Sequence, residues 1–180
     1  HEEEFSKKGG LFQMVQLWVN LPAKDKMSPP KYQGIKQNEI EQFTLPDNSG
    51  IIEIIAGKYQ DKKGSANTYS PIEMYNARLN SGGKFNFNFE ANYNTGIVVI
   101  EGKVKINETE IADVNQFIHF KNEGEEIKIE ALTQSVLLIL SGEPINEPIA
   151  AYGPFLMNKP EEIQQAIADY NNGKFGYLDE

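Results

Sequence analysis

The chain has 180 residues and a formal net charge of -9, with 39% apolar and 24% charged residues. A chain of this length and composition forms one well-filled globular core and leaves little room for a second complete domain. Binding a phosphate backbone or an anionic membrane needs clustered Lys and Arg, so the acidic balance argues against nucleic-acid and membrane partners. The sequence contains no cysteine, which excludes disulfides, thiolate metal ligands and a cysteine nucleophile.

Histidine is scarce as well. His1 and His119 are the two in the chain, which excludes a self-contained site built from several histidines. We expect His119, in QFIHFKNEG, to be a packed or surface residue of a strand. No stretch approaches the ~18 apolar residues of a membrane span, and no signal peptide is visible, so a cytoplasmic protein is expected.

The first expected element is LFQMVQLWVNL, from Leu11 to Leu21. It is too apolar for a surface strand, so we expect a strand that other parts of the protein cover, with the single tryptophan, Trp18, in a core. A Pro- and Lys-rich loop follows. The weakly patterned stretch from Gly34 to Gly50 then indicates a linker.

Short strands separated by turn residues dominate from there to residue 150. KFNFNFE alternates strictly, which predicts a half-buried strand with Phe85, Phe87 and Phe89 on its inner face. The other predicted strands lie in IIEIIAG, in GIVVIEGKVKINETEIA with a break at Glu101-Gly102, in EEIKIEA and in SVLLILSG. The pattern indicates an antiparallel all-β sandwich or barrel.

One helix is predicted near the end of the chain. Asn158 stands as a capping residue before Pro160 and two glutamates, and all of these favour a first helical turn. Gly173 is placed to end the helix in a left-handed conformation. The apolar stripe with i, i+3, i+4, i+7 spacing consists of Ile163, Ala166, Ile167 and Tyr170.

Two pairs of adjacent carboxylates, Glu125-Glu126 and Glu161-Glu162, are candidates for acid–base chemistry. A catalytic pair must face one cleft and have separated proton affinities. Neighbouring residues of a strand point to opposite faces, and the second pair lies where the start of a helix favours acids. We therefore expect both pairs to be structural.

Gly83 and Gly102 have the spacing of the cupin motif, which runs Gly, five residues, His, one residue, His, three or four residues, Glu, six residues and Gly. In that register the three ligand positions are Phe89, Ala91 and Thr95. Phe and Ala carry no donor, and a lone Thr hydroxyl is too weak a ligand for iron or zinc. The segment therefore resembles a degenerate cupin whose cavity is filled by aromatic side chains instead of a metal.

The two flanking segments carry a more specific resemblance. QLWVNLPAKDKMSPPKYQ near the start and SGEPINEPIAAYGPFLMNKPEEIQQAIADYNNGKFG near the end resemble two signatures of the pirin family, in the right order and separation. The resemblance implies an all-β antiparallel cupin of the jelly-roll type, with a C-terminal α-helix and an N-terminal strand left over from a preceding cupin. It divides the chain into the tail of a first, metal-binding cupin (1–33), a linker (34–48), a second, degenerate cupin (49–158) and the C-terminal helix and tail (159–180).

The resemblance also implies a metal. Pirins bind one metal, usually iron, in the first cupin through three histidines and one glutamate. His1 and Glu3 stand where the last two ligands, a His-x-Glu just before the Gln-Leu-Trp strand, are expected. On a strand, residues i and i+2 share a face, as shared coordination requires. The other ligands, a His-x-His, are missing from this chain, so no stoichiometric metal is expected in it. A tag scar or an acid-rich tail is the plainer alternative for this start.

The resemblance leaves two functions open. In the first, the chain is the C-terminal cupin portion of a pirin-like protein, catalytically silent alone, and serves as a structural or binding module. In the alternative, it is part of an iron-dependent flavonol (quercetin) 2,3-dioxygenase whose remaining ligands lie outside this chain, and Glu3 also accepts the substrate proton. A third reading, a carbohydrate-binding sandwich, needs an exposed aromatic platform, whereas the rings are expected to point inward.

The resemblance to pirins also leads to an expectation about how the chain associates. An apolar strand without its natural neighbours invites pairing. We therefore expect a homodimer through Leu11–Leu21, with exchange of this segment as one route, and a further protein partner is left open.

Overall fold

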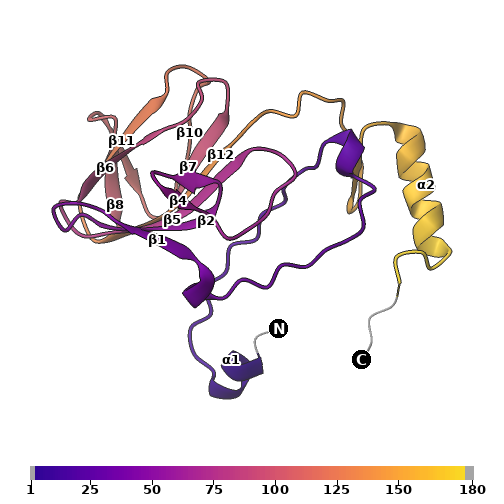
Figure 1. The fold of residues 1–180 in the computed structure, drawn as a ribbon, viewed down its shortest axis with the longest axis horizontal. Helices are drawn as coiled ribbons and strands as arrows, with labels where there is room; N and C mark the ends of the chain where they lie inside the picture. The colour runs from indigo at the N-terminus through magenta and orange to yellow at the C-terminus, as the bar shows by residue number, and fades with distance from the viewer. Residues whose placement is uncertain (1–2, 177–180) are drawn as a thin grey trace.

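The structure, a computed structural model, describes residues 3–176. Figure 1 shows the strands of the two large sheets gathered at one end of the molecule and helix α2 at the other, joined by long segments without regular structure. Two antiparallel sheets form the sandwich, one of six strands and one of four. The six-stranded sheet consists, in spatial order, of β1 (Glu41–Thr44), β2 (Gly50–Ala56), β5 (Ile72–Leu79), β12 (Ser135–Gly142), β7 (Asn94–Glu101) and β10 (Phe117–His119).

The second sheet and the smaller elements complete the fold. The four-stranded sheet consists of β6 (Lys84–Asn88), β11 (Glu126–Ala131), β8 (Lys103–Ile106) and β9 (Glu110–Asp113). Two short hairpins are β3 (Lys58–Tyr59) with β4 (Lys62–Lys63), and β13 (Ala150–Tyr152) with β14 (Phe155–Met157). The helices are α1 (Glu3–Lys8) and α2 (Pro160–Asn171), with 3-10 turns η1 (Ala23–Asp25) and η2 (Gln37–Glu39). Within the described part of the chain, no helix is both long and apolar enough to cross a membrane.

The core lies between the two sheets and follows from strand alternation. On the central strand β12, Leu137 and Ile139 point inward, and both have no exposed surface. Ile139 is paired with Tyr75 of β5 on one side and with Ile97 of β7 on the other, and these neighbours are also buried. Because side chains alternate along a strand, this register places three large apolar side chains next to one another in the core.

The strand predictions between residues 84 and 142 are confirmed. The first five residues of KFNFNFE form β6, and Phe85, Phe87 and Phe89 are all buried. The predicted break at Glu101-Gly102 separates β7 from β8. The all-β antiparallel fold with a C-terminal helix is therefore confirmed.

Both glycines of the cupin-like spacing lie where another backbone segment approaches closely. Gly102 has a φ of 80°, and a Cβ there would overlap the carbonyl oxygen of Gln134 and Oγ of Ser135. A Cβ at Gly83 would overlap the carbonyl oxygen of Ser49. The spacing thus marks two positions at which side chains are sterically excluded.

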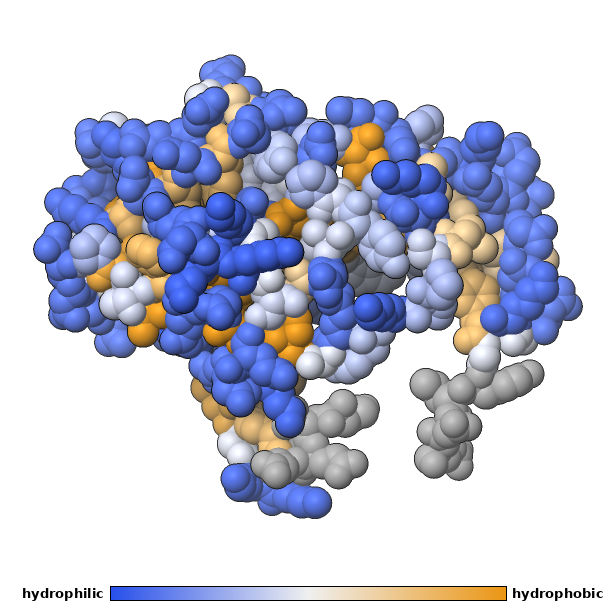
Figure 2. All heavy atoms as spheres, in the orientation of Figure 1, coloured by the Kyte–Doolittle hydropathy of each residue, from blue (hydrophilic) through white to orange (hydrophobic). Residues whose placement is uncertain are grey.

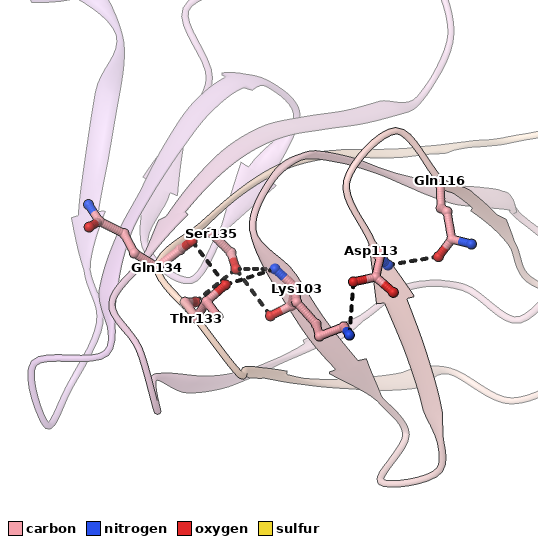
Figure 3. A network of polar contacts seen from close by, with 6 residues as sticks. All are labelled: Lys103, Asp113, Gln116, Thr133, Gln134 and Ser135. Atoms are coloured by element: carbon pink, nitrogen blue, oxygen red, sulfur yellow. Dashed lines mark hydrogen bonds and ion pairs between the residues drawn. The ribbon is translucent and has the colours of Figure 1, made fainter.

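A polar network ties the β7–β8 turn to the start of β12 (Figure 3). Ser135 Oγ donates to the carbonyl of Thr133 over 2.8 Å, and the backbone N–H of Lys103 donates to Thr133 Oγ1 over 3.0 Å. Lys103 Nζ lies 3.0 Å from Asp113 Oδ1. Ser135 is 1% exposed, so these contacts satisfy polar groups that water does not reach.

The prediction for Leu11–Leu21 is wrong in two respects. Residues 9–22 form no strand, and Trp18 is 73% exposed instead of lying in a core. The segment crosses the outer face of the six-stranded sheet, where Leu17 and Met74 line the same hollow. Among the described residues no strand hydrogen-bonds to the segment, and a strand needs such a neighbour to satisfy its backbone groups.

The stretch expected as a linker, residues 34–48, contains strand β1, which pairs with β2 along its full length. Phe43 of β1 packs against the core. Part of this stretch therefore belongs to the sandwich.

Helix α2 begins and ends close to the predicted positions, but the hydrogen bonds at its start differ from the predicted cap. The Asn158 amide donates to Glu147 Oε2 over 3.0 Å and to the carbonyl of Pro148 over 2.9 Å, so Asn158 is not the capping residue. Glu162 Oε2 instead accepts the backbone N–H groups of Asn158 and Lys159. Gly173, with a φ of 72°, follows the end of the helix as predicted. Ile163 is buried, whereas Tyr170, predicted to pack, is 64% exposed.

Candidate functional site

The three positions at which cupins carry their ligands hold no metal-binding group here. Phe89 is 8% exposed and stacks on Phe87, with ring centroids 5.6 Å apart. Thr95 Oγ1 is buried and shares a 2.7 Å hydrogen bond with Ser141 Oγ. Ala91 is half-buried. The interior of the sandwich therefore lacks the imidazole or carboxylate set that iron or zinc requires.

Aromatic rings fill this interior instead. Phe87 contacts the rings of Tyr59 and Tyr75 at centroid distances of 5.6 Å each, and that of Phe85 at 4.5 Å. The Tyr75 hydroxyl donates to the carbonyl of Lys58 over 2.7 Å and also contacts the Glu73 carboxylate. The prediction of a cavity filled by aromatics is confirmed.

Tyr75 is a buried titratable group that stacks on Phe87 and Phe89 in this interior. Burial raises the pKa of its phenol far above the usual range, and the Glu73 carboxylate raises that pKa further because it disfavours a second negative charge. The phenol therefore stays protonated at physiological pH. It acts as a hydrogen-bond donor and not as a base.

The remaining candidates lie on the surface. His119 is exposed on β10 beside Phe117, as expected of a surface strand residue. Glu126 accepts a 3.0 Å hydrogen bond from the Asn86 amide, and Glu162 satisfies the first turn of α2. Within residues 3–176, no three His, Asp or Glu side chains are grouped so that they could hold a metal ion.

The predicted metal ligands at the start of the chain stay a prediction. His1 lies outside the described residues, and Glu3 is the first residue of helix α1 and not part of a strand.

A hollow of about 610 Å³ on the outer face of the six-stranded sheet was not predicted. Its lining includes Trp18 from the N-terminal segment, Phe117 and His119 from β10, and Met74 and Leu140 from the sheet. The pattern of SVLLILSG contained a signal for it, because Leu140, which lines the hollow, is an apolar residue on the face opposite the core.

Comparison with known proteins places the chain in a family. Residues 74–176 match the Pirin C-terminal cupin domain. The chain belongs to the pirin family. The match covers more than half of the chain, and the family resemblance read from the two flanking segments is confirmed.

Relatives of this pirin chain carry two kinds of name. A putative quercetin 2,3-dioxygenase of Pseudomonas aeruginosa is 40% identical over 97% of the chain and 61% of the relative. Human pirin is 32% identical over 91% of the chain and 57% of the relative. The crystal structure of a quercetin 2,3-dioxygenase from Acinetobacter baumannii superposes with a TM-score of 0.93 at 42% identity, covering 99% of this chain and 62% of that one. The pirin chain thus spans about three fifths of the length of these relatives.

Proposed function

We propose that the 180-residue chain is a non-catalytic structural and binding portion of a pirin-type protein, silent as an oxygenase when it is alone. The observation that carries the proposal is the replacement of the cupin ligand positions by Phe89, Ala91 and a hydrogen-bonded Thr95. Metal-dependent oxygenation needs a metal with open coordination positions. The sandwich interior offers neither donors nor space for one.

The second candidate function is a contribution to a flavonol 2,3-dioxygenase, and the names of the relatives favour it. In that case His1 and Glu3 complete an iron site whose other ligands lie outside this chain. Iron would supply binding of the flavonol and of O2. Glu3 would accept the proton of the flavonol hydroxyl, because a carboxylate within hydrogen-bond reach is a competent base.

One assay separates the two. The purified chain is incubated with Fe²⁺ and quercetin, and oxygen uptake and loss of flavonol absorbance are followed beside the A. baumannii enzyme as positive control. We expect no turnover above that of free Fe²⁺ and no stoichiometric iron by elemental analysis. Turnover that scales with the chain and disappears in Glu3→Gln but not in Glu4→Gln would overturn the proposal and support the second candidate.

The homodimer through Leu11–Leu21 stays a prediction, and the exposure of the segment supports it. Leu11 is 95% exposed and Phe12 60% exposed. We expect light scattering at high concentration to give twice the monomer mass. The double change Leu11→Ser with Phe12→Ser should weaken association by more than about tenfold, because it removes apolar surface that a partner would bury. Tyr32→Ser, a change at a 92% exposed ring elsewhere, is the control. A wild-type monomer at high concentration would contradict the prediction.

A further inference from the structure

The Pro- and Lys-rich loop between η1 and η2 contains a stretch whose backbone shape follows from its residues. Pro29 has its φ fixed at about -65° by its own ring, and the ring of Pro30 disfavours the α region for the residue before it. Pro29 is therefore restricted to the polyproline II region. In agreement, the described residues 29–36 form no helix, strand or turn. The loop thus presents an extended proline pair, followed by Lys31 and Tyr32.

All four residues of this segment, 29–32, are exposed. Tyr32 is 92% exposed, so almost the whole ring is open to a partner. Pro29 and Pro30 line a hollow of about 310 Å³ together with Tyr69, so space remains beside the proline rings. Because none of these side chains belongs to the core, replacing one of them should leave the sandwich folded.

Hydrogen bonds hold the chain on both sides of segment 29–32. On one side, the backbone N–H of Ser28 donates to the carbonyl of Asp25 over 3.0 Å. On the other, Gln33 Oε1 accepts the backbone N–H of Asn67 over 2.8 Å, and Gln33 Nε2 donates to the carbonyl of Asn67 over 3.0 Å. The segment is therefore a short bridge between two fixed points. Ordering it on binding costs less conformational entropy than ordering a free peptide.

The order of the side chains indicates which kind of groove fits them. A polyproline II helix has three residues per turn and rises ~3.1 Å per residue, so a side chain three positions after a proline returns to the same side. Pro29 and Tyr32 have this spacing. Pro-Pro-x-Tyr is the pattern that domains of the WW type read with an aromatic-lined groove for the prolines and a pocket for the tyrosine. No two of the nine prolines are three residues apart, so a groove that reads Pro-x-x-Pro finds no match.

The surroundings of the segment add a preference of charge. Figure 2 shows a mainly hydrophilic exterior interrupted by smaller apolar areas, so a partner has to recognise particular rings and not one broad apolar face. Lys24 and Lys31 are exposed on the loop and give it positive charge, although the whole chain has a net charge of -9. Acidic residues at the rim of the partner's groove would therefore favour the encounter.

We propose that segment 29–32 docks in the aromatic groove of a WW-type domain of another protein. The proline rings fill the groove, and the Tyr32 ring enters the neighbouring pocket. The segment lies outside Leu11–Leu21 and outside the sandwich interior. The proposal is therefore independent of the predicted dimer and of the proposed function, and both stand if the docking fails.

Nuclear magnetic resonance tests the docking directly. An isotope-labelled WW domain that binds Pro-Pro-x-Tyr peptides is titrated with the unlabelled 180-residue chain. We expect the resonances of its groove residues to shift until one chain is bound per domain. A synthetic peptide of residues 27–33 should compete, because it carries the same four residues. The folded chain should bind at least as tightly as the peptide, since its loop is held on both sides.

Two variants of the chain locate the contact. Tyr32→Ala removes the ring that enters the pocket, and Pro30→Ala removes one proline ring and the restriction that it places on Pro29. Each should weaken binding by about tenfold or more, because each removes a buried anchor. Tyr152→Ala, at a 69% exposed ring, and Pro148→Ala, at an exposed proline, are the matched controls and should leave the affinity unchanged. Circular dichroism checks that all four variants are folded.

Three results would overturn the proposal. The first is no shift of the groove resonances by the folded chain, whether or not the free peptide binds. The second is unchanged affinity in both Tyr32→Ala and Pro30→Ala. The third is an equal loss of affinity in Tyr152→Ala or Pro148→Ala, which would mean that the domain recognises exposed rings without regard to their order.

Discussion

Gly102→Ala, at the turn between β7 and β8, is expected to destabilise the sandwich by about 2–5 kcal/mol. The positive φ of 80° alone costs about 1–2 kcal/mol for a residue with a Cβ. The added Cβ would also overlap the carbonyl oxygen of Gln134 and Oγ of Ser135. Relief of that overlap moves the turn and disturbs the network around Ser135 shown in Figure 3, which adds about 1–3 kcal/mol.

Gly82→Ala is the matched control for this change. Gly82 has nearly the same φ, 81°, but no atom lies within 4 Å of the position of a Cβ. Gly82→Ala should therefore lower the free energy of unfolding only by the cost of placing a residue with a Cβ at a positive φ. Urea denaturation of both variants measures the difference, which we expect to be about 1–3 kcal/mol. Equal losses would show that the contact with Gln134 and Ser135 relaxes without cost.

Phe87→Ala is expected to cost about 3–5 kcal/mol of unfolding free energy, the range for removal of a buried ring. Phe87 is 2% exposed and contacts the rings of Tyr59, Tyr75, Phe85 and Phe89. The two sheets hold these neighbours in place, so the space left by the ring cannot close fully.

The control for Phe87→Ala is Tyr32→Ala, which removes an aromatic ring that is 92% exposed and lies outside the Leu11–Leu21 segment. Its unfolding free energy should change by no more than about 0.5 kcal/mol. Thermal and urea unfolding measured on both variants test the contrast. A small loss for Phe87→Ala would mean that water or a shifted Tyr59 ring fills the former cavity, and that the interior is less rigid than its packing indicates.

The result for Phe87→Ala bears on the proposed function, because Phe87 fills the interior in which a metal-binding cupin holds its metal. A cupin that binds metal keeps donors and an open position inside its barrel, whereas here the interior is packed by rings and is part of the stabilising core. A loss of this size in Phe87→Ala would show that the rings of this interior stabilise the sandwich. The exposed apolar surface of the chain lies on the outside, at the Leu11–Leu21 segment and around the hollow beside Trp18.

Sequence patterns predicted the sandwich well because they report on local geometry. The strict alternation in KFNFNFE requires a strand with one buried face, and β6 has that form. Gly102 marks a turn with a positive φ, which splits the predicted run into β7 and β8. Pro160 and Gly173 bracket α2 because each favours one end of a helix.

The start of helix α2 shows a case in which the local sequence pattern predicted the wrong capping residue. Asn158 has the side chain of a good capping residue, yet it donates to Glu147 and Pro148 from another part of the chain. The competing contacts could not be read from the local sequence. Glu162 holds the start of the helix in another way, because its carboxylate accepts the backbone N–H groups of Asn158 and Lys159 just before the first turn.

By itself the sequence determined the family, most of the core strands with the buried face of KFNFNFE, and the loss of metal ligands at Phe89, Ala91 and Thr95, because residue type and period are local properties. Only the tertiary structure decided the state of Leu11–Leu21, since an apolar run becomes a strand only where another strand supplies backbone partners. It also decided that Trp18, Phe117 and His119, about 100 residues apart in the chain, line one hollow. Side chains this far apart meet only through the folding of the sheet between them.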